Sequence, residues 1–215
     1  MKLPHHACGA LFLLLLIAGC DLLNQTAIIS EDPASGPQPP RTLSKPDSVL
    51  KMLTYLFDRH RPEDAQAVGD LLYTGYVYRY DDPTDNNDLE LDRASEIQVH
   101  RNIFRSFETI SAYFTPESRW NEYGSDMPRP PDVPPYQVSS AHPNETWVVL
   151  RVLGDMTFTN TDLQAVQVGY QVRQRFDIAF RLDPAQKDST WQIASWTDRE
   201  FLLSAKVARN ADDGL

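Results

Sequence analysis

Positive charge is scarce in this chain. Its 215 residues include 20 Lys and Arg against 30 Asp and Glu, which gives a formal net charge of −10 at pH 7. Proteins that bind nucleic acid draw much of their affinity from Lys and Arg side chains that neutralise phosphates. The composition therefore argues against nucleic acid as a partner.

The chain also lacks a long apolar run at its N-terminus. Residues 10–18 are apolar, but a membrane-spanning helix needs about 20 such residues. The run follows Lys2 and ends in Ile17-Ala18-Gly19-Cys20, which resembles the lipobox of bacterial lipoproteins. The resemblance implies a signal peptide over residues 1–19 and acyl chains on Cys20 that anchor the protein to a membrane. An ordinary secretory signal with a nearby cysteine is the alternative.

Cysteine is nearly absent, since Cys8 and Cys20 are the only two. We expect Cys8 to leave with the signal peptide and Cys20 to be acylated, so no disulfide can form. The predicted location is the bacterial cell envelope, with the lipid-anchored protein facing the periplasm or the cell surface. Asp21 resembles the inner-membrane retention signal of enteric bacteria, and the choice between inner and outer membrane stays open.

Residues 20–45 contain too few apolar residues to build a core. Four prolines, Pro33, Pro37, Pro39 and Pro40, stand among Ser, Gly, Gln and Asp. This composition predicts that the lipidated cysteine is followed by a disordered linker. The folded domain is expected over residues 46–201, and a flexible C-terminal tail over residues 202–215.

The strongest pattern in the chain is an alternation over residues 166–182. Even positions are apolar except Gln174, and odd positions are mostly polar. Successive side chains of a strand point to opposite faces, so this segment predicts a strand with one buried face. Strands usually stop by about 10 residues, so a strand of this length must curl. Gly169 is the expected place for a bend or bulge.

Apolar spacing elsewhere predicts helices first and further strands afterwards. Helices are expected at about residues 46–61 and 62–72 and from about residue 92. Strands are expected at about residues 76–80, 110–121, 146–159 and 191–201.

This order of elements resembles the nuclear-transport-factor-2-like fold, also called SnoaL-like or cystatin-like. Its members include SnoaL-type polyketide cyclases, ketosteroid isomerase and scytalone dehydratase. The resemblance is carried by Leu71-Leu72-Tyr73-Thr74-Gly75-Tyr76-Val77-Tyr78 and by Trp191-Gln192-Ile193. It implies an α+β cone-shaped barrel, with three N-terminal helices packed on the concave face of a strongly curved, mostly antiparallel sheet. It does not imply an activity, since the same cone serves enzymes, ligand binders and assembly modules.

His100 is the sharpest candidate for chemistry. It falls inside the apolar stripe of the third helix, between Phe104 and Phe107. A titratable ring on a pocket-lining helix could act as a general base near neutral pH. The alternative is a core histidine whose ring nitrogens are hydrogen-bonded to a backbone carbonyl or a tyrosine hydroxyl.

The predicted ligand pocket combines the tyrosine row of the first strand, the third helix and the inward row of the long strand. Its members are Tyr76, Tyr78, Tyr80, His100, Phe104, Tyr170, Gln174 and Phe176. The tyrosine hydroxyls could bind a ligand or lie at the rim of a filled core. The lone amide of Gln174 must find a partner in either case.

No cofactor or metal is expected. Ketosteroid isomerase-like chemistry needs an Asp base and an oxyanion hole of Tyr and protonated Asp. The inward row of the long strand carries no Asp or Glu, and Asp177 has outward parity. The acidic stretch over residues 81–92 lacks the spacing of a calcium-binding EF-hand loop.

Two expectations concern the surface. The proline-rich loop over residues 128–135 could lie over the mouth of the pocket as a lid. Trp191 and Trp196 have opposite parity, so one of them should lie on the outer face, and an apolar patch there predicts a weak homodimer. The proline-rich loop or the C-terminal tail could instead cover that patch.

The leading hypothesis is a non-catalytic, membrane-tethered domain that binds a small apolar ligand or a partner protein. A small-molecule isomerase, dehydratase or cyclase using His100 and the pocket tyrosines is one alternative, and a purely structural envelope protein is another. Whether the protein is an enzyme stays open.

Overall fold

The computed structural model describes residues 38–80, 89–161, 167–183 and 190–209. The helices in these ranges are α2 (Pro46–Arg59), α3 (Asp64–Leu71) and α4 (Arg93–Ser106), with the short 3-10 helix η3 (Pro135–Gln137). The strands are β1 (Leu72–Tyr80), β2 (Leu89–Asp92), β3 (Thr109–Gly124), β4 (Val138–Ser139), β5 (Thr146–Thr161), β6 (Gln167–Leu182) and β7 (Trp191–Arg209). Within the described ranges, no helix has the length and apolar character needed to cross a membrane.

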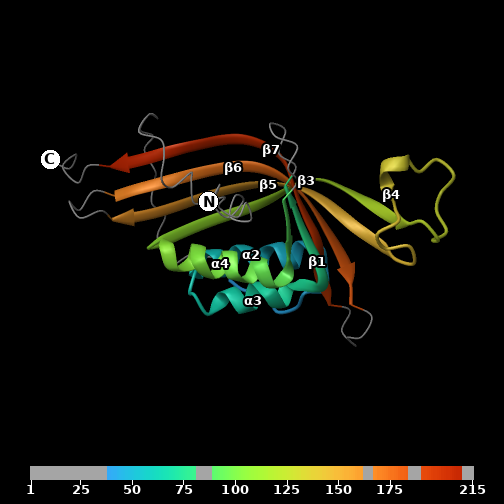
Figure 1. The fold of residues 1–215 in the computed structure, drawn as a ribbon, viewed down its shortest axis with the longest axis horizontal. Coiled ribbons are helices and arrows are strands. Elements are labelled where there is room, and N and C mark those ends of the chain that lie inside the picture. Colours follow the sequence, from blue (N-terminus) through green and yellow to red (C-terminus); the bar gives the residue numbers. More distant parts are fainter. Residues whose placement is uncertain (1–37, 81–88, 162–166, 184–189, 210–215) are drawn as a thin grey trace, which may run out of the picture.

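The described strands form one mixed sheet in the order β2-β1-β7-β6-β5-β3-β4. Neighbouring strands are antiparallel except β1 with β7 and β3 with β4. The sheet bends over the three helices, which lie together on its inner side (Figure 1). The predicted α+β class, with helices on the concave face of a strongly curved and mostly antiparallel sheet, is confirmed.

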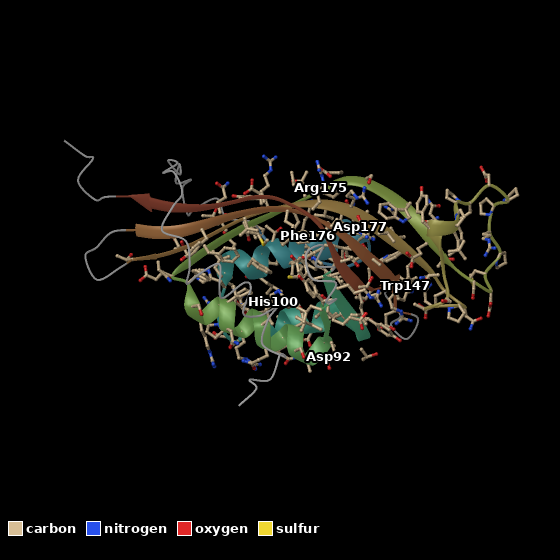
Figure 2. The ribbon with its side chains drawn as sticks, turned by 45° about the horizontal axis from the view of Figure 1, so that its top comes forward. Asp92, His100, Trp147, Arg175, Phe176 and Asp177 are labelled. Atoms are coloured by element: carbon tan, nitrogen blue, oxygen red, sulfur yellow. The ribbon has the colours of Figure 1, made fainter. Side chains whose placement is uncertain are left out.

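Strand β6 has the predicted buried face. Phe176, Ile178 and Phe180 are at most 4% exposed and belong to the main core. Figure 2 shows His100 on the helix side of the sheet and Arg175 on the opposite side. The alternation of side chains along β6 therefore gives this strand one core face and one outer face.

The curvature does not come from a bulge at Gly169, and that expectation is wrong. Gly169 pairs with Thr159 in an unbroken stretch of the β5–β6 register. A Cβ at Gly169 would lie 2.8 Å from the Phe158 carbonyl oxygen, so glycine serves here for close approach of the two strands. The irregularities in the pairing of β6 lie toward β7, at residues 173/174, 175/176 and 179/180.

Strand β7 is longer than predicted. Its pairing with β6 continues to Arg209, opposite Gln167, because the long β6 offers hydrogen-bonding groups over its whole length. Strand β7 thus extends over residues 202–209 of the predicted C-terminal tail, and residues 210–215 lie outside the described residues. At the other end of β7, the Trp191 N–H donates to the Leu43 carbonyl at 2.9 Å, so the predicted linker already contacts the domain there. Cys20 and the signal segment lie outside the described residues.

Both tryptophans of β7 pack against the core, which corrects the prediction that one lies outside. Ser195 pairs with Ala179 and Ile193 pairs with Phe180, so Ala194 is an extra residue in β7. Such a bulge reverses the alternation of side chains along a strand. Trp191 and Trp196 therefore both contact the core cluster. The homodimer stays a prediction, but it loses this support.

Helix α4 is held against the sheet by its first residues and by α3. The Asp92 side chain accepts a hydrogen bond from the Ser95 N–H at 2.8 Å and caps the helix. Gly69 of α3 allows close packing, since a Cβ there would lie 2.4 Å from Ile97 Cδ1. The face buried by these contacts comprises Glu96, Ile97, His100 and Phe104.

The proline-rich loop does not cover the helix side of the sheet. It is carried by the long β3–β5 hairpin, and β4 beside it lies at the end of the molecule away from the helices (Figure 1). The prediction of a lid over a pocket between sheet and helices is therefore wrong.

Candidate functional site inside the cone

Aromatic rings fill the interface between the helices and the inner face of the sheet. The ring of Phe57, on α2, lies 5.3 Å from the ring of His100 and 5.4 Å from the ring of Phe104. On the sheet, Trp196 lies 5.0 Å from Phe176. Gly154 makes room for that packing, because a Cβ there would lie 2.4 Å from the Phe176 ring. Charged groups are disfavoured in such surroundings.

His100 is hydrogen-bonded to its own helix. Its Nδ1 lies 2.9 Å from the Glu96 backbone carbonyl and donates to it, because a carbonyl only accepts. Burial lowers the pKa of His100 to about 4, and the hydrogen bond to Glu96 opposes that change. The ring is therefore neutral at pH 7. This environment is that of the hydrogen-bonded core histidine, and the low pKa makes His100 a weak base.

Glu96 lies one helical turn before His100 and shares its burial. Its side chain is 10% exposed, with Oε1 3.4 Å from His100 Nδ1. Burial raises the pKa of Glu96 to about 7. A carboxyl group with this pKa can take up or release a proton near neutral pH.

Asp198 of β7 brings a second carboxyl group into the interior. The Tyr78 hydroxyl donates to Asp198 Oδ2 at 2.7 Å, and Gln174 also hydrogen-bonds this carboxyl. Burial raises the pKa of Asp198 to about 6, and both hydrogen bonds oppose the rise. The lone amide of Gln174 thus has a partner inside the cone.

Three buried polar atoms have no hydrogen-bond partner within the described part of the chain. They are Tyr76 Oη, Trp196 Nε1 and Asp198 Oδ1. All three belong to β1 and β7, which lie side by side with Tyr78 opposite Trp196. A buried polar group without a partner costs about 1–3 kcal/mol, and native proteins keep few of them. The Tyr76 hydroxyl can donate or accept a hydrogen bond, Trp196 Nε1 can only donate one, and Asp198 Oδ1 can accept one.

The predicted pocket residues fall into groups in the structure. Tyr76, Tyr78 and Gln174 lie with Asp198, whereas His100, Phe104 and Phe176 belong to the aromatic packing around them. Tyr80 pairs with Asp198 in the backbone register of β1 and β7. Tyr170 lies four residues before Gln174 on β6, with its ring 6.4 Å from that of Phe107. Their role as ligand contacts stays a prediction.

Sequence reasoning missed Glu96 and Asp198. Glu96 precedes His100 by four residues and Phe104 by eight, so helical spacing alone places it on the buried face. Asp198 lies on the same face of β7 as Trp196. Because of the bulge at Ala194, counting alternate residues from the start of β7 does not identify this face as the inner one. The inward row of β6 carries no Asp or Glu, as the sequence indicates. The two carboxyl groups inside the cone come instead from Glu96 on α4 and Asp198 on β7.

The described residues contain no group of three His, Cys, Asp or Glu side chains arranged to hold a metal ion. Of the acidic stretch over residues 81–92, residues 81–88 lie outside the described residues. In the described remainder, Glu90 pairs with Arg79 and Asp92 caps α4.

Comparisons with known proteins show similarity among solved structures. No protein-family model matches the chain, and no curated protein matches it. A candidate scytalone dehydratase from Novosphingobium aromaticivorans DSM 12444 is 11% identical over 74% of this chain and 83% of its own, with a TM-score of 0.44. ActVI-ORFA from Streptomyces coelicolor is 11% identical over 70% and 90%, with a TM-score of 0.37. A type 2 hexachlorocyclohexane dehydrochlorinase, LinA, is 7% identical over 74% and 87%, with a TM-score of 0.38.

At identities of 7–11% and TM-scores of 0.37–0.44, these similarities do not assign the chain to a family or an activity.

Proposed function

We propose that the cone binds a small, mainly apolar molecule that carries one hydroxyl or carbonyl group. The observation that supports this function is the set of unpaired buried atoms, Tyr76 Oη, Trp196 Nε1 and Asp198 Oδ1. Small-molecule sites are mostly apolar, with a few polar groups that orient the ligand. A ligand oxygen here would accept hydrogen bonds from Tyr76 and Trp196, and a ligand hydroxyl would also donate to Asp198.

A purely structural role accounts for the aromatic packing but not for these three atoms. Buried water could pair with them, so water is the competing occupant. The two occupants differ in one respect that can be measured. A ligand site prefers an aromatic molecule with a hydroxyl group over the same molecule without it, whereas a filled core binds neither.

The test measures binding of 2-naphthol and of naphthalene to the full chain by equilibrium dialysis. One net hydrogen bond contributes about 0.5–1.5 kcal/mol, so 2-naphthol should bind about 2–12-fold more tightly. The variants Tyr76→Phe and Trp196→Phe should reduce this preference while naphthalene binding persists. Tyr113→Phe, which changes a tyrosine that is 56% exposed, is the matched control. Equal binding of the two compounds, or binding of neither, would contradict the proposal.

A proton-transfer enzyme is the second candidate, and one observation favours it. The pKa values of Glu96 and Asp198 are raised to about 7 and about 6, which suits an acid or base near neutral pH. Tyr76 and Trp196 could stabilise the negative charge that develops on a carbonyl oxygen. This reading keeps the isomerase or dehydratase class but replaces His100 by a carboxyl group as the base. Exchange of the α-protons of 2-indanone in D₂O, faster with the wild type than with Asp198→Asn, would support it.

The membrane anchor remains a proposal from the sequence. We propose that Cys20 is acylated and holds the domain at a membrane of the bacterial cell envelope. The lipobox-like stretch before Cys20 supports this proposal, and Cys20 lies outside the described residues.

A further inference from the structure

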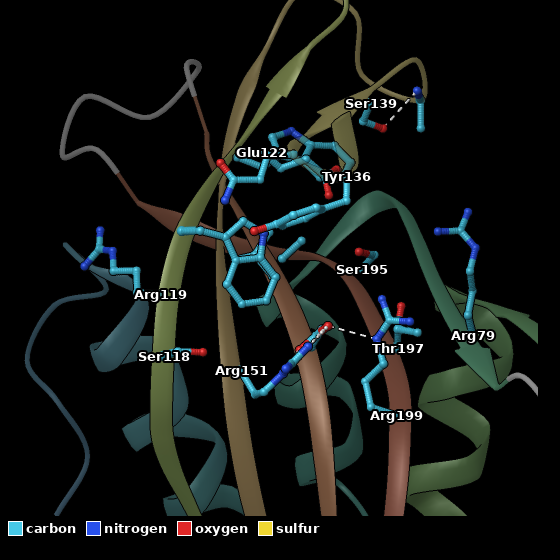
Figure 3. A pocket seen from close by; sticks show the side chains of 17 residues that line it. Arg79, Ser118, Arg119, Glu122, Tyr136, Ser139, Arg151, Ser195, Thr197 and Arg199 are labelled. Atoms are coloured by element: carbon cyan, nitrogen blue, oxygen red, sulfur yellow. Dashed lines mark hydrogen bonds and ion pairs between the residues drawn. The ribbon is translucent and has the colours of Figure 1, made fainter. Parts of the chain in front are cut away.

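A groove lies on the outer face of the sheet, opposite the helices, and arginines gather around it (Figure 3). Its volume is about 780 Å³, within the range of about 300–1,000 Å³ that is usual for small-molecule sites. The floor is formed by outward side chains of neighbouring strands, among them Val149, Ala179 and Ser195. The groove is separated from the cone by the sheet itself.

Asp177 organises the arginines at the bottom of the groove. Arg151 binds it through two contacts, Nε to Oδ1 at 2.9 Å and Nη2 to Oδ2 at 3.1 Å. Arg199 binds the same carboxylate, Nε to Oδ2 at 2.8 Å. The Asp177 side chain is 7% exposed, whereas the arginines are 43% and 48% exposed. One carboxylate thus orients two guanidinium groups, and the trio keeps a net positive charge.

Arg199 lies at a bulge of β7. Phe176 pairs with Asp198 and Arg175 pairs with Glu200, so Arg199 is an extra residue without a partner across β6. Bulges re-aim side chains in this way and are frequent beside functional sites. The buried carboxyl of Asp198 and the groove arginine Arg199 are therefore adjacent in sequence and lie on opposite faces of the sheet.

The groove is basic in a chain that is acidic overall. Its lining includes the arginines Arg79, Arg119, Arg151 and Arg199 and the acids Glu122 and Asp177. Asp177 is paired with Arg151 and Arg199, and Arg79 is paired with Glu90 at 2.9 Å. Glu122 lies 2.7 Å from His142 Nε2, a pair that compensates the carboxylate only when the histidine is protonated. Within the described part of the chain, Arg119 has no ion-pair partner. An anionic ligand would therefore meet uncompensated positive charge.

Aromatic side chains form the walls. The guanidinium of Arg151 lies 5.7 Å from the Trp120 ring centre, and Trp147 stacks on His142 with 3.8 Å between ring centres. Tyr136, in the short helix η3, also lines the groove and is 73% exposed.

We propose that the outer groove binds a small aromatic oxyanion, a planar ring that bears a carboxylate or phosphate. Guanidinium groups bind such oxygens through paired charge-assisted hydrogen bonds, and aromatic walls contact the ring. A small molecule fits better than a second copy of the chain, because copies with a net charge of −10 repel each other.

The test measures the binding of 2-naphthoate and of its uncharged analogue 2-naphthamide to the full chain by equilibrium dialysis. Naphthoate should bind at least about tenfold more tightly, as hydrogen bonds to charged groups are worth more than neutral ones. Arg151→Gln and Arg199→Gln should each lower the affinity about tenfold or more. Arg173→Gln is the matched control, since Arg173 is an exposed outward arginine of β6 that does not line the groove. Equal losses in all three variants would indicate unspecific attraction and overturn the proposal.

Further measurements distinguish an aromatic anion from inorganic phosphate, and binding in the groove from binding in the cone or contact between two copies of the chain. Phenyl phosphate should bind more tightly than inorganic phosphate, and equal affinities would overturn the aromatic part of the proposal. Tyr76→Phe should leave naphthoate binding unchanged, since a loss would place the anion in the cone. A dimer that dissociates on Arg199→Gln in sedimentation experiments would make the groove an interface between copies and overturn the proposal. Unfolding midpoints close to that of the wild type would show that the variants are folded.

Discussion

The buried carboxyl of Glu96 should make the stability of this protein depend on pH in a specific way. The variant Glu96→Gln replaces it with an amide of nearly the same size, which cannot ionise and which keeps an oxygen to face His100. At low pH the two proteins should therefore differ little. At high pH the wild type must carry a buried charge and the variant carries none.

The magnitude and sign follow from the pKa, which burial raises from 4.5 to about 7. Between these values the unfolded chain has lost the proton while the folded chain retains it, so the stability of the folded state falls as pH rises. Each pKa unit corresponds to about 1.4 kcal/mol. The stability advantage of Glu96→Gln should thus grow by about 3 kcal/mol from pH 4.5 to pH 7 and stay constant above.

The assay is urea unfolding followed by circular dichroism at several pH values between 4.5 and 8, for wild type and variant. The difference between the two proteins is the informative quantity, because other groups act in both. His100 has the opposite effect on the pH dependence of stability. Its pKa is lowered from 6.5 to about 4, so the stability that its neutral form contributes is lost as pH falls below 6.5. Glu63→Gln, at an exposed glutamate before α3, is the control and should give a constant difference. A constant difference for Glu96→Gln as well would refute the reasoning.

Two further predictions concern the long strand and the anchor. Phe176→Ala should cost about 3–5 kcal/mol because the ring is 4% exposed and packs on Trp196. Arg175→Ala should cost less than about 1 kcal/mol because its pair with Glu117 is partly exposed. Urea unfolding measures both, and equal losses would mean that the two faces of β6 are misassigned. Cys20→Ala should abolish acylation and move the protein to the soluble fraction, and an unlipidated wild type in mass spectrometry would contradict the anchor.

Local patterns in the sequence were enough to predict the main elements. The alternation in β6 and the helical spacing before it depend only on where neighbouring side chains of one segment point. These patterns therefore predicted three helices and a long curled strand, the resemblance based on their order implied an α+β class, and the structure confirms both. The position of Glu96 on the buried face of α4 was readable in the same way.

The pairing register between strands decided which face each residue of β7 lies on and which distant residues meet. The bulge at Ala194 exists only in the pairing of β7 with β6, so a count along β7 alone assigned a tryptophan to the wrong face. The hydrogen bond from Tyr78 to Asp198 joins residues 120 positions apart. No local pattern contains such a contact, because it arises from the parallel pairing of β1 with β7.

The sequence by itself therefore determined which segments have a buried face. Burial of apolar side chains drives folding, so apolar residues recur in the sequence with the period of the helix or strand that buries them. Only the tertiary structure decided which polar groups meet. Two carboxyl groups lie inside the cone because α4 packs on the inner side of the sheet, to which Asp198 of β7 also points. The arginine groove exists because Asp177 on β6 is flanked by Arg151 on β5 and Arg199 on β7, and these residues come together only when the sheet forms.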